Sequence, residues 1–295
     1  MNYEITGKTK LTALIGSPVA HSISPQMHNE AYHQLGLDYV YLAFDIEQNQ
    51  LQDTIFGFKA MEVAGFNVTM PFKTAVIPFL DELSPQARLS NAVNTVVHRE
   101  NRLFGHTTDG IGYINALKAD GVFIRGNKMT LLGAGGAAFS ICVQAAFDGA
   151  SSIDMFKRKP AHTDDKKDSW AETLDFCKRT EMETGCPIHL YDINDKAKLK
   201  ASLLESRILT NATNAGMAPD INSCVIDDIT FLHKDLFVSD IIYNPKETLL
   251  LKMAKKAGCS CQNGLNMLLY QGAEAFRLFT GREMPTKLIK QKYFK

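Results

Sequence analysis

Short apolar runs recur along the chain between glycine, proline and polar residues, which is the pattern of buried strands in an α/β protein. In the first half, these runs predict strands at residues 11–16, 39–46 and 65–71, and a β-hairpin made of residues 91–98 and 103–108. In the second half, they predict strands at residues 129–132, 152–156, 188–191, 207–211 and 237–242. Because strands alternate with helical segments there, we expect the second half to form a parallel sheet.

Helices are expected between the apolar runs. In the first of them, Ser24 is placed to cap the helix, Pro25 suits its first turn and Gly36 ends it. The polar segment Ala161–Asp168 is expected to be a mobile loop. The other predicted helices lie at residues 51–63, 74–83, 111–117, 137–146, 169–184, 196–204 and 266–280.

The most informative local pattern is a glycine-rich turn between a predicted strand and a predicted helix. Gly133, Gly135 and Ala138 have the G-x-G-x-x-A spacing of dinucleotide-binding turns. Gly133 permits the tight turn, Gly135 lets the backbone approach a pyrophosphate, and Ala138 lets the helix pack closely on the strand. The free N–H groups at the helix N-terminus favour phosphate. The alternative interpretation is a buried glycine turn that binds nothing.

Composition narrows the class of protein. The 295 residues are enough for two domains, and 32 basic residues balance 32 acidic ones, so nothing indicates nucleic-acid binding. The N-terminus lacks the pattern of a signal peptide, and no apolar run is long enough for a membrane span, so we expect a cytoplasmic protein. Its 6 cysteines are expected to be reduced, and we expect no metal, because Cys259 and Cys261 have no partners at zinc spacing.

Five polar positions are candidates for chemistry, and most have a simpler interpretation. Ser22 and Ser24 stand beside a helix start, where they can bind a carboxylate or, for Ser24, only cap the helix. Lys73 would lie in the first turn of a predicted helix, where the dipole disfavours a cation, so its position is a hint of function. The alternative is a solvated surface lysine, which is the commoner case for a single lysine. Asp109 stands at a predicted helix N-terminus, where it can be a reacting acid or only the N-cap. Tyr243 follows the last apolar strand, at the carboxyl end of the sheet, where such sheets bind ligands.

Together, these motifs closely resemble the signature blocks of the shikimate dehydrogenase family. The resemblance covers almost the whole chain, and the blocks occur in the family's order. Residues 160–195 and 271–274 look most similar to the branch that oxidises quinate as well as shikimate. The matching blocks lie at residues 22–25, 65–73, 91–95, 108–110, 133–137, 211–213, 240–245 and 264–272.

The resemblance implies an α/β enzyme with a Rossmann-like dinucleotide-binding domain, an α/β substrate domain, and an active-site cleft between them. Residues 1–111, completed by C-terminal helices in residues 262–295, would bind the substrate, and residues 112–261 would bind NAD(P). Lys73 and Asp109 would be the catalytic pair. The substrate would be bound by Ser22, Ser24, Thr69, Asn94, Tyr243 and Gln271. The cofactor would be bound by Gly133, Ala134, Gly135, Gly136, Ala137, Lys157, Arg158, Lys159, Thr213, Ile241 and Gly264.

The implied reaction is the reversible reduction of 3-dehydroshikimate to shikimate, a step of aromatic amino acid biosynthesis. In the oxidative direction the nicotinamide takes a hydride from carbon, and a side chain takes a proton from oxygen. A Lys–Asp pair can hold the hydroxyl and exchange its proton, and which of the two is formally the base stays open. The alternatives are a quinate-type catabolic dehydrogenase and a non-catalytic regulator that binds a shikimate-like ligand. The protein is expected to be a monomer or a homodimer.

The expected cofactor is NADP, with NAD or both as the alternative. An acid near the end of the second strand would bind the ribose of NAD, whereas basic residues suit the 2′-phosphate of NADP. Asp154 has about the right spacing but stands inside the predicted strand. The basic residues at the strand end, 157–159, favour NADP, and Arg158 has the planar fork that suits a phosphate.

Two residues depart from the family's pattern. Thr107 stands where the family usually has asparagine, which is expected to weaken a polar contact near the substrate. Asn214 stands where the family usually has proline. The quinate-type branch varies at this second position too, so the change does not indicate lost activity.

Overall fold

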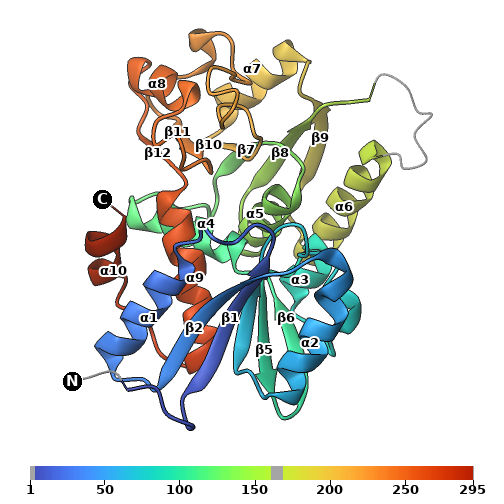
Figure 1. Ribbon diagram of the computed structural model, residues 1–295. Coiled ribbons are helices and arrows are strands. Elements are labelled where there is room, and N and C mark those ends of the chain that lie inside the picture. Colours follow the sequence, from blue (N-terminus) through green and yellow to red (C-terminus); the bar gives the residue numbers. More distant parts are fainter. Residues whose placement is uncertain (1–3, 161–168, 295) are drawn as a thin grey trace. The chain divides into compact units, whose positions relative to one another are not determined.

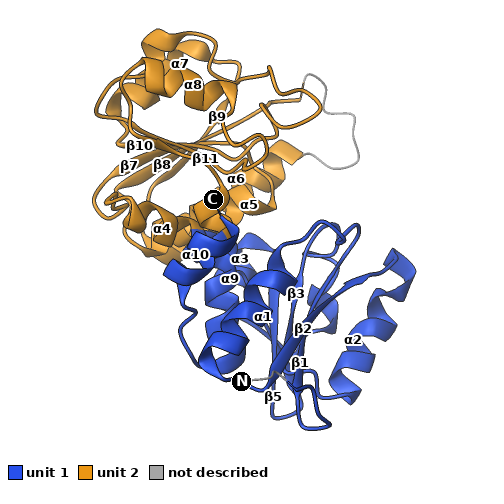
Figure 2. Cartoon of the chain, turned by 60° about the vertical axis from the view of Figure 1, so that its left-hand side comes forward, with its two compact units in different colours: residues 1–112, 269–295 blue, residues 113–268 orange. Residues whose placement is uncertain are grey.

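The computed structural model describes residues 4–160 and 169–294, so the predicted loop at 161–168 lies outside the described residues. The chain divides into two compact units (Figure 2): residues 1–112 with 269–295 form unit 1, and residues 113–268 form unit 2. The divisions fall inside two helices, α4 (Asp109–Ala119) and α9 (Leu265–Thr280). The second division therefore comes later in the chain than residue 262, where the C-terminal helices were expected to begin.

Unit 1 is built on a mixed sheet in the strand order β2-β1-β3-β5-β6-β4 (Figure 1). Its strands are β1 (Lys10–Gly16), β2 (Tyr39–Asp45), β3 (Gly65–Val68), β4 (Glu82–Leu83), β5 (Thr95–Arg99) and β6 (Arg102–His106). Strand β1 runs parallel to β2 and β3, whereas β5 is antiparallel to both β3 and β6. The predicted hairpin is confirmed as β5 and β6, joined by Glu100 and Asn101, which both have positive φ as a two-residue hairpin turn requires.

Helices pack on this sheet around an apolar core. They are α1 (Ser24–Leu35), α2 (Leu51–Ala60), α3 (Pro85–Ser90) and α10 (Thr286–Tyr293), together with most of α9. Gly36 ends α1 in the left-handed conformation, as predicted. Between the sheet and α2, the core contains the fully buried side chains of Ile15, Ile55, Phe66 and Val96.

The prediction of a helix at residues 74–83 is wrong. The segment instead forms turns, the short 3₁₀ helix η2 (Ile77–Phe79) and strand β4. Pro78 explains the difference, since a proline inside an α-helix removes one hydrogen bond and clashes with the preceding turn. Lys73 therefore does not lie in the first turn of a helix, and the dipole argument made for it does not hold.

The capping role predicted for Ser24 is also wrong. Helix α1 includes Ser24 as its first residue, and Ile23 occupies the N-cap position without a side-chain hydrogen bond. Pro25 does lie in the first turn, as expected. Since the Ser24 side chain is not needed to cap the helix, it is available for another contact.

Unit 2 is a parallel sheet in the order β12-β11-β10-β7-β8-β9, and the predicted parallel pairing is confirmed. Its strands are β7 (Lys128–Leu132), β8 (Ser152–Lys157), β9 (Ile188–Asp192), β10 (Ile208–Asn211), β11 (Phe237–Asp240) and β12 (Cys261–Gln262). Its helices are α5 (Gly136–Phe147), α6 (Ser169–Thr184), α7 (Lys196–Glu205), α8 (Leu249–Lys256) and parts of α4 and α9. With β7 as the first strand, the order is that of a Rossmann fold. Among the described helices, none is long and apolar enough to cross a membrane.

Buried polar side chains connect the middle of this sheet to α7. Asp154, on β8, is almost completely buried and lies 2.8 Å from Lys128 Nζ and 2.7 Å from Ser202 Oγ. Its other oxygen lies 3.1 Å from His189 Nδ1. Burial alone raises the pKa of Asp154, but the bonds from Lys128, Ser202 and His189 outweigh burial and lower it. Asp154 is thus inside its strand, as predicted, and is committed to structural contacts.

We predict that Asp154→Asn lowers the free energy of unfolding by roughly 1.5–3 kcal/mol at neutral pH, because a buried charged acceptor is lost. The pKa of Asp154 is lower in the folded chain than its unfolded value of about 3.9. Its stabilising contribution is therefore present above that pH and is lost as the pH falls through the folded-state pKa. Chemical denaturation at pH 7 and pH 3 should show the two proteins converging at low pH. Asp175→Asn, at an exposed position on α6, is the matched control.

Candidate active site

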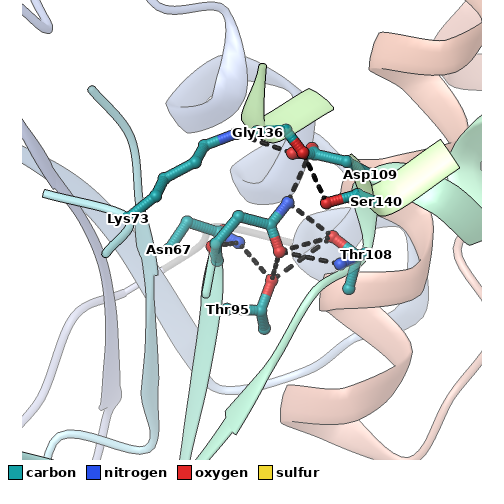
Figure 3. Close-up of polar contacts among 8 residues, drawn as sticks. Asn67, Lys73, Thr95, Thr108, Asp109, Gly136 and Ser140 are labelled. Atoms are coloured by element: carbon teal, nitrogen blue, oxygen red, sulfur yellow. Dashed lines mark hydrogen bonds and ion pairs between the residues drawn. The ribbon is translucent and has the colours of Figure 1, made fainter. Parts of the chain in front are cut away.

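Lys73 and Asp109 form an ion pair in unit 1 (Figure 3). Lys73 Nζ lies 2.6 Å from Asp109 Oδ2, and the two side chains are 26% and 11% exposed. The backbone positions Lys73 in the turn after β3, since its carbonyl accepts from Val93 N at 2.8 Å. Asp109 is the first residue of α4, as predicted. The pair is therefore held by two separate elements and keeps some contact with solvent, as a reacting pair requires.

Asn94 fixes the orientation of the Asp109 carboxylate. Its Nδ2 donates to Asp109 Oδ1 at 2.8 Å and to Thr108 Oγ1 at 3.0 Å. Its Oδ1 accepts from Thr108 N at 2.8 Å and from Thr95 Oγ1 at 3.0 Å. The side chain is buried, and both ends of its amide are bonded, so the amide cannot flip without losing buried hydrogen bonds. Each oxygen of Asp109 thus has a defined donor.

A chain of buried hydrogen bonds extends from Asn94 back to Ser24. Asn67 Nδ2 donates to Thr95 Oγ1 at 2.9 Å, as Figure 3 shows, and to the carbonyl of Asn94 at 3.0 Å. Asn67 Oδ1 accepts from the phenol of Tyr41 at 2.8 Å, and that phenol is also bonded to the Ser24 side chain. Burial raises the pKa of Tyr41 well above its usual value, so the phenol keeps the proton that it donates. The chain links an expected carboxylate-binding residue to the ion pair.

A neutral histidine packs against this chain. The His28 ring stacks on Tyr41 with ring centroids 4.3 Å apart and is completely buried. Burial lowers the pKa of His28 to about 3, because the charged form would be desolvated. At neutral pH the ring therefore adds no charge beside the phenol.

The remaining substrate candidates divide between the two units. Ser22 Oγ accepts from Ser24 N at 3.3 Å. Thr69 is half-buried after β3, and its N–H donates to the carbonyl of Ile15 at 2.9 Å. Gln271 lies on α9, against Gly112 of α4, where a Cβ would come within 2.5 Å of Gln271 N. Tyr243 belongs to unit 2, where it is 43% exposed after β11.

The glycine-rich turn of unit 2 has the geometry that its sequence predicts. Gly133 has φ +107°, and a Cβ there would lie 2.7 Å from the carbonyl oxygen of Ala212. Gly135 is extended at the N-cap of α5, and Gly136 begins the helix. Both are exposed, and a Cβ at either would meet nothing within 4 Å. The N-terminus of α5 is therefore open to a phosphate, with Ala134 and Ala137 on either side of the two glycines.

The basic residues after β8 differ in their surroundings. Lys157 Nζ donates to Thr173 Oγ1 at 2.8 Å and to the carbonyl of Ser169, so its ammonium is bonded to α6. Lys159 Nζ lies 5.6 Å from the centroid of the Trp170 ring. Arg158 is exposed, and its guanidinium makes no hydrogen bond to any described residue. Arg158 is thus the member of this group best placed to meet an anion from solvent.

The other cofactor candidates of unit 2 follow the carboxyl ends of its strands. Thr213 comes after β10 and Ile241 after β11. Gly264 follows β12, and a Cβ there would lie 1.9 Å from the carbonyl oxygen of Ile241, so only glycine fits. The described residues contain no group of three or more His, Cys, Asp or Glu side chains that could hold a metal ion.

Sequence reasoning assigned no role to several residues that organise these sites. Tyr41, Asn67 and Thr108 belong to the buried chain in unit 1, and Asn211 and Asp240 are buried at strand ends in unit 2. For Tyr41 and Asn67 the available signal was a polar residue at a strand position whose two neighbours are apolar. Such a residue needs a hydrogen-bond partner, but the sequence does not show which one.

Comparisons with known proteins agree with this architecture. The family model for the shikimate dehydrogenase substrate binding domain matches residues 14–96, and that for the shikimate 5'-dehydrogenase C-terminal domain matches residues 264–292. A shikimate dehydrogenase (NADP(+)) from Listeria monocytogenes is 47% identical over 290 residues, covering 98% of this chain and 97% of the relative. The chain belongs to the shikimate dehydrogenase family.

Other shikimate dehydrogenases show the same full-length similarity. The enzyme from Streptococcus uberis, also named as NADP(+)-dependent, is 44% identical over 297 residues, with 100% of this chain and 98% of the relative covered. A crystal structure of shikimate 5-dehydrogenase from Listeria monocytogenes, in complex with shikimate and NAD, is 46% identical with a TM-score of 0.92. It covers 99% of this chain, which spans 98% of that one. The fold of the family is therefore retained throughout the described parts of this chain.

Proposed function

We propose that this protein is a shikimate dehydrogenase that catalyses the reversible, NADP-dependent oxidation of shikimate to 3-dehydroshikimate. The observation that carries the proposal is the Lys73–Asp109 ion pair at 2.6 Å, with the carboxylate oriented by Asn94. A regulator that only bound the ligand would not need an oriented acid–base pair. Full-length similarity to named shikimate dehydrogenases supports the same activity.

In this proposal, unit 1 binds the substrate. Ser22 and Ser24 bind the carboxylate, and Thr69, Asn94, Gln271 and Tyr243 are the candidates for contact with the hydroxyl groups. Lys73 and Asp109 hold the hydroxyl that is oxidised and take its proton as a unit. The buried chain from Ser24 to Asn94 supports this arrangement, because it connects the residues at the two ends of the substrate through hydrogen bonds.

Unit 2 binds the dinucleotide in this proposal. The exposed N-terminus of α5, at Gly135 and Gly136, fits a pyrophosphate, and Arg158 fits a 2′-phosphate. When bound, NADP accepts a hydride from the substrate carbon. Asp154 does not compete for the ribose, because its carboxylate is buried and bonded to Lys128, Ser202 and His189. Thr213, Ile241 and Gly264 complete the site with the turn 133–137 and the residues at 157–159.

The decisive experiment mixes purified protein with shikimate and NADP⁺ and follows the absorbance of reduced nicotinamide. Shikimate oxidation with NADP⁺ is the expected result. Parallel reactions with quinate and with NAD⁺ measure the preference for each substrate and cofactor. Oxidation of quinate but not of shikimate would identify a quinate-type dehydrogenase instead. Shikimate binding without any turnover would identify a regulator.

The ion pair generates the first prediction for catalysis. Asp109→Asn keeps the shape of the side chain but removes its charge, so kcat should fall by roughly 10²–10⁴ with the thermal unfolding temperature close to wild type. Lys73→Ala should cause a loss of similar order. The double variant should be little worse than either single variant, because residues that act as a unit are not additive.

Lys59→Ala is the matched control for Lys73→Ala, because Lys59 forms a separate ion pair with Asp81, at 3.1 Å, in the same unit. Its kcat should stay at the wild-type value. Full turnover by Asp109→Asn, with both shikimate and quinate, would show that the pair does not perform the reaction.

The surroundings of Arg158 generate a prediction for cofactor choice. Arg158→Ala should raise the KM for NADP⁺ roughly tenfold or more and leave the KM for NAD⁺ nearly unchanged, because the loss is specific to the 2′-phosphate. Arg207→Ala is the control. Arg207 precedes β10, so it lies at the amino-terminal ends of the parallel strands, whereas Arg158 follows the carboxyl end of β8. Equal effects of Arg158→Ala on both cofactors would mean that Arg158 does not select between them.

A further inference from the structure

Asp240 is a completely buried carboxylate at the end of β11 that the proposed reaction does not use. Its Oδ1 accepts from Ile242 N at 3.0 Å and from Asn211 Nδ2 at 3.1 Å. Its Oδ2 accepts from Thr248 Oγ1 at 2.7 Å. Burial raises the pKa of Asp240, and the three hydrogen bonds oppose that rise; Ile242 N and Asn211 Nδ2 can only donate, which suits an ionised carboxylate. Asp240 differs from the equally buried Asp154 in its position, at the carboxyl end of β11, next to the proposed cofactor residue Ile241.

The first consequence concerns the segment after β10. Because Asn211 Nδ2 donates to Asp240, Asn211 Oδ1 must face the other way. There it accepts from Thr213 N at 3.1 Å and from Thr213 Oγ1 at 2.6 Å. Thr213 Oγ1 in turn accepts from Ala215 N at 3.1 Å. Asn211 Nδ2 also donates to the carbonyl of Ala215 at 3.3 Å. Asp240 and that carbonyl together set the orientation of the amide, and the amide supports the conformation of the residues that follow it.

The second consequence concerns the space around the glycines. The residue between Asn211 and Thr213 is Ala212, whose carbonyl oxygen lies 2.7 Å from where a Cβ on Gly133 would be. On the other side, Ile241 N donates to the carbonyl of Asn211 at 3.0 Å, and Gly264 N donates to the carbonyl of Ile242 at 3.0 Å. The segments after the adjacent strands β10, β11 and β12 (Figure 1) are thus packed so closely that a Cβ fits at neither Gly133 nor Gly264.

We propose that Asp240 is a positioning residue for dinucleotide binding, which holds the segments after β10 and β11 in the conformation that the cofactor requires. The inference rests on the proposed function, because it assumes that Thr213, Ile241 and Gly264 contact the cofactor. Asp240 acts through Asn211, Ile242 and Thr248 and does not touch the cofactor itself. Through the segment after β11 it also sets the position of Tyr243.

The test is Asp240→Asn in the full chain, with NADPH affinity measured by fluorescence titration without substrate. An asparagine keeps all three contacts only if its oxygen takes the place of Oδ1 and the Thr248 hydroxyl turns to accept from its NH₂ group, and it carries no charge. Because hydrogen bonds to a neutral acceptor are weaker than those to a carboxylate, the segments after β10 and β11 are held less firmly, and the Kd for NADPH should rise roughly tenfold or more. This measurement does not depend on turnover.

Asp154→Asn is the matched control, because it makes the same substitution at another buried strand aspartate of the same sheet. The bonds of Asp154 go to Lys128, Ser202 and His189, none of which we place in the cofactor site. This variant should lose thermal stability and keep its Kd for NADPH within roughly twofold. A comparison of the two variants therefore separates loss of stability from loss of positioning.

Thr248 provides a second variant in case Asp240→Asn does not fold. Thr248→Val removes one donor to Asp240 and the N-cap acceptor of α8 at nearly constant shape, and Thr248→Ser retains both. Thr248→Val should raise the Kd for NADPH, whereas Thr248→Ser should keep the Kd close to the wild-type value. An unchanged Kd in the folded Asp240→Asn or Thr248→Val protein, with wild-type shikimate turnover intact, would overturn the positioning role but not the proposed function. Absence of shikimate turnover in the wild type would instead contradict the proposed function.

Discussion

Leaving a buried hydrogen-bonding group unpaired is costly, and this constraint organises both candidate sites. A buried amide with donors on one side and acceptors on the other has one allowed orientation, because the flipped form leaves buried groups unpaired. Asn94 uses this property to aim its NH₂ group at Asp109, and Asn211 uses it to aim its oxygen at Thr213. In each case a side chain that performs no chemistry of its own determines where a functional group points.

The two units apply the constraint on different scaffolds. In unit 1 the polar chain runs through a mixed sheet, from Tyr41 on β2 to Thr95 on β5, and ends at an ion pair that keeps contact with solvent. In unit 2 the parallel strands deliver their carboxyl ends to one edge, where the glycine-rich turn and the segment carrying Thr213 meet. One scaffold suits an oriented acid–base pair, and the other suits an extended dinucleotide.

Asp154 and Asp240 show that similar burial serves different purposes. Both are strand aspartates of unit 2, and three side chains or backbone groups bind each carboxylate. The partners of Asp154 lie on β9, on α7 and at the start of β7, away from the proposed site. The partners of Asp240 belong to segments that adjoin the dinucleotide turn. Position along a parallel strand, rather than residue type, therefore separates a structural carboxylate from a positioning one.

The sequence by itself determined the alternation of strands and helices and the glycine-rich turn, because periodicity and turn chemistry are local properties. The candidate pair Lys73 and Asp109 came from the resemblance to the family. It was wrong about the helix at residues 74–83, where Pro78 outweighs an apolar pattern, and about the cap at Ser24. Only the tertiary structure decided that Lys73 reaches Asp109, that Tyr41 and Asn67 link Ser24 to Asn94, and that Asp240 binds Asn211. These contacts join residues far apart in the chain, and their partners depend on strand register, which no local pattern specifies.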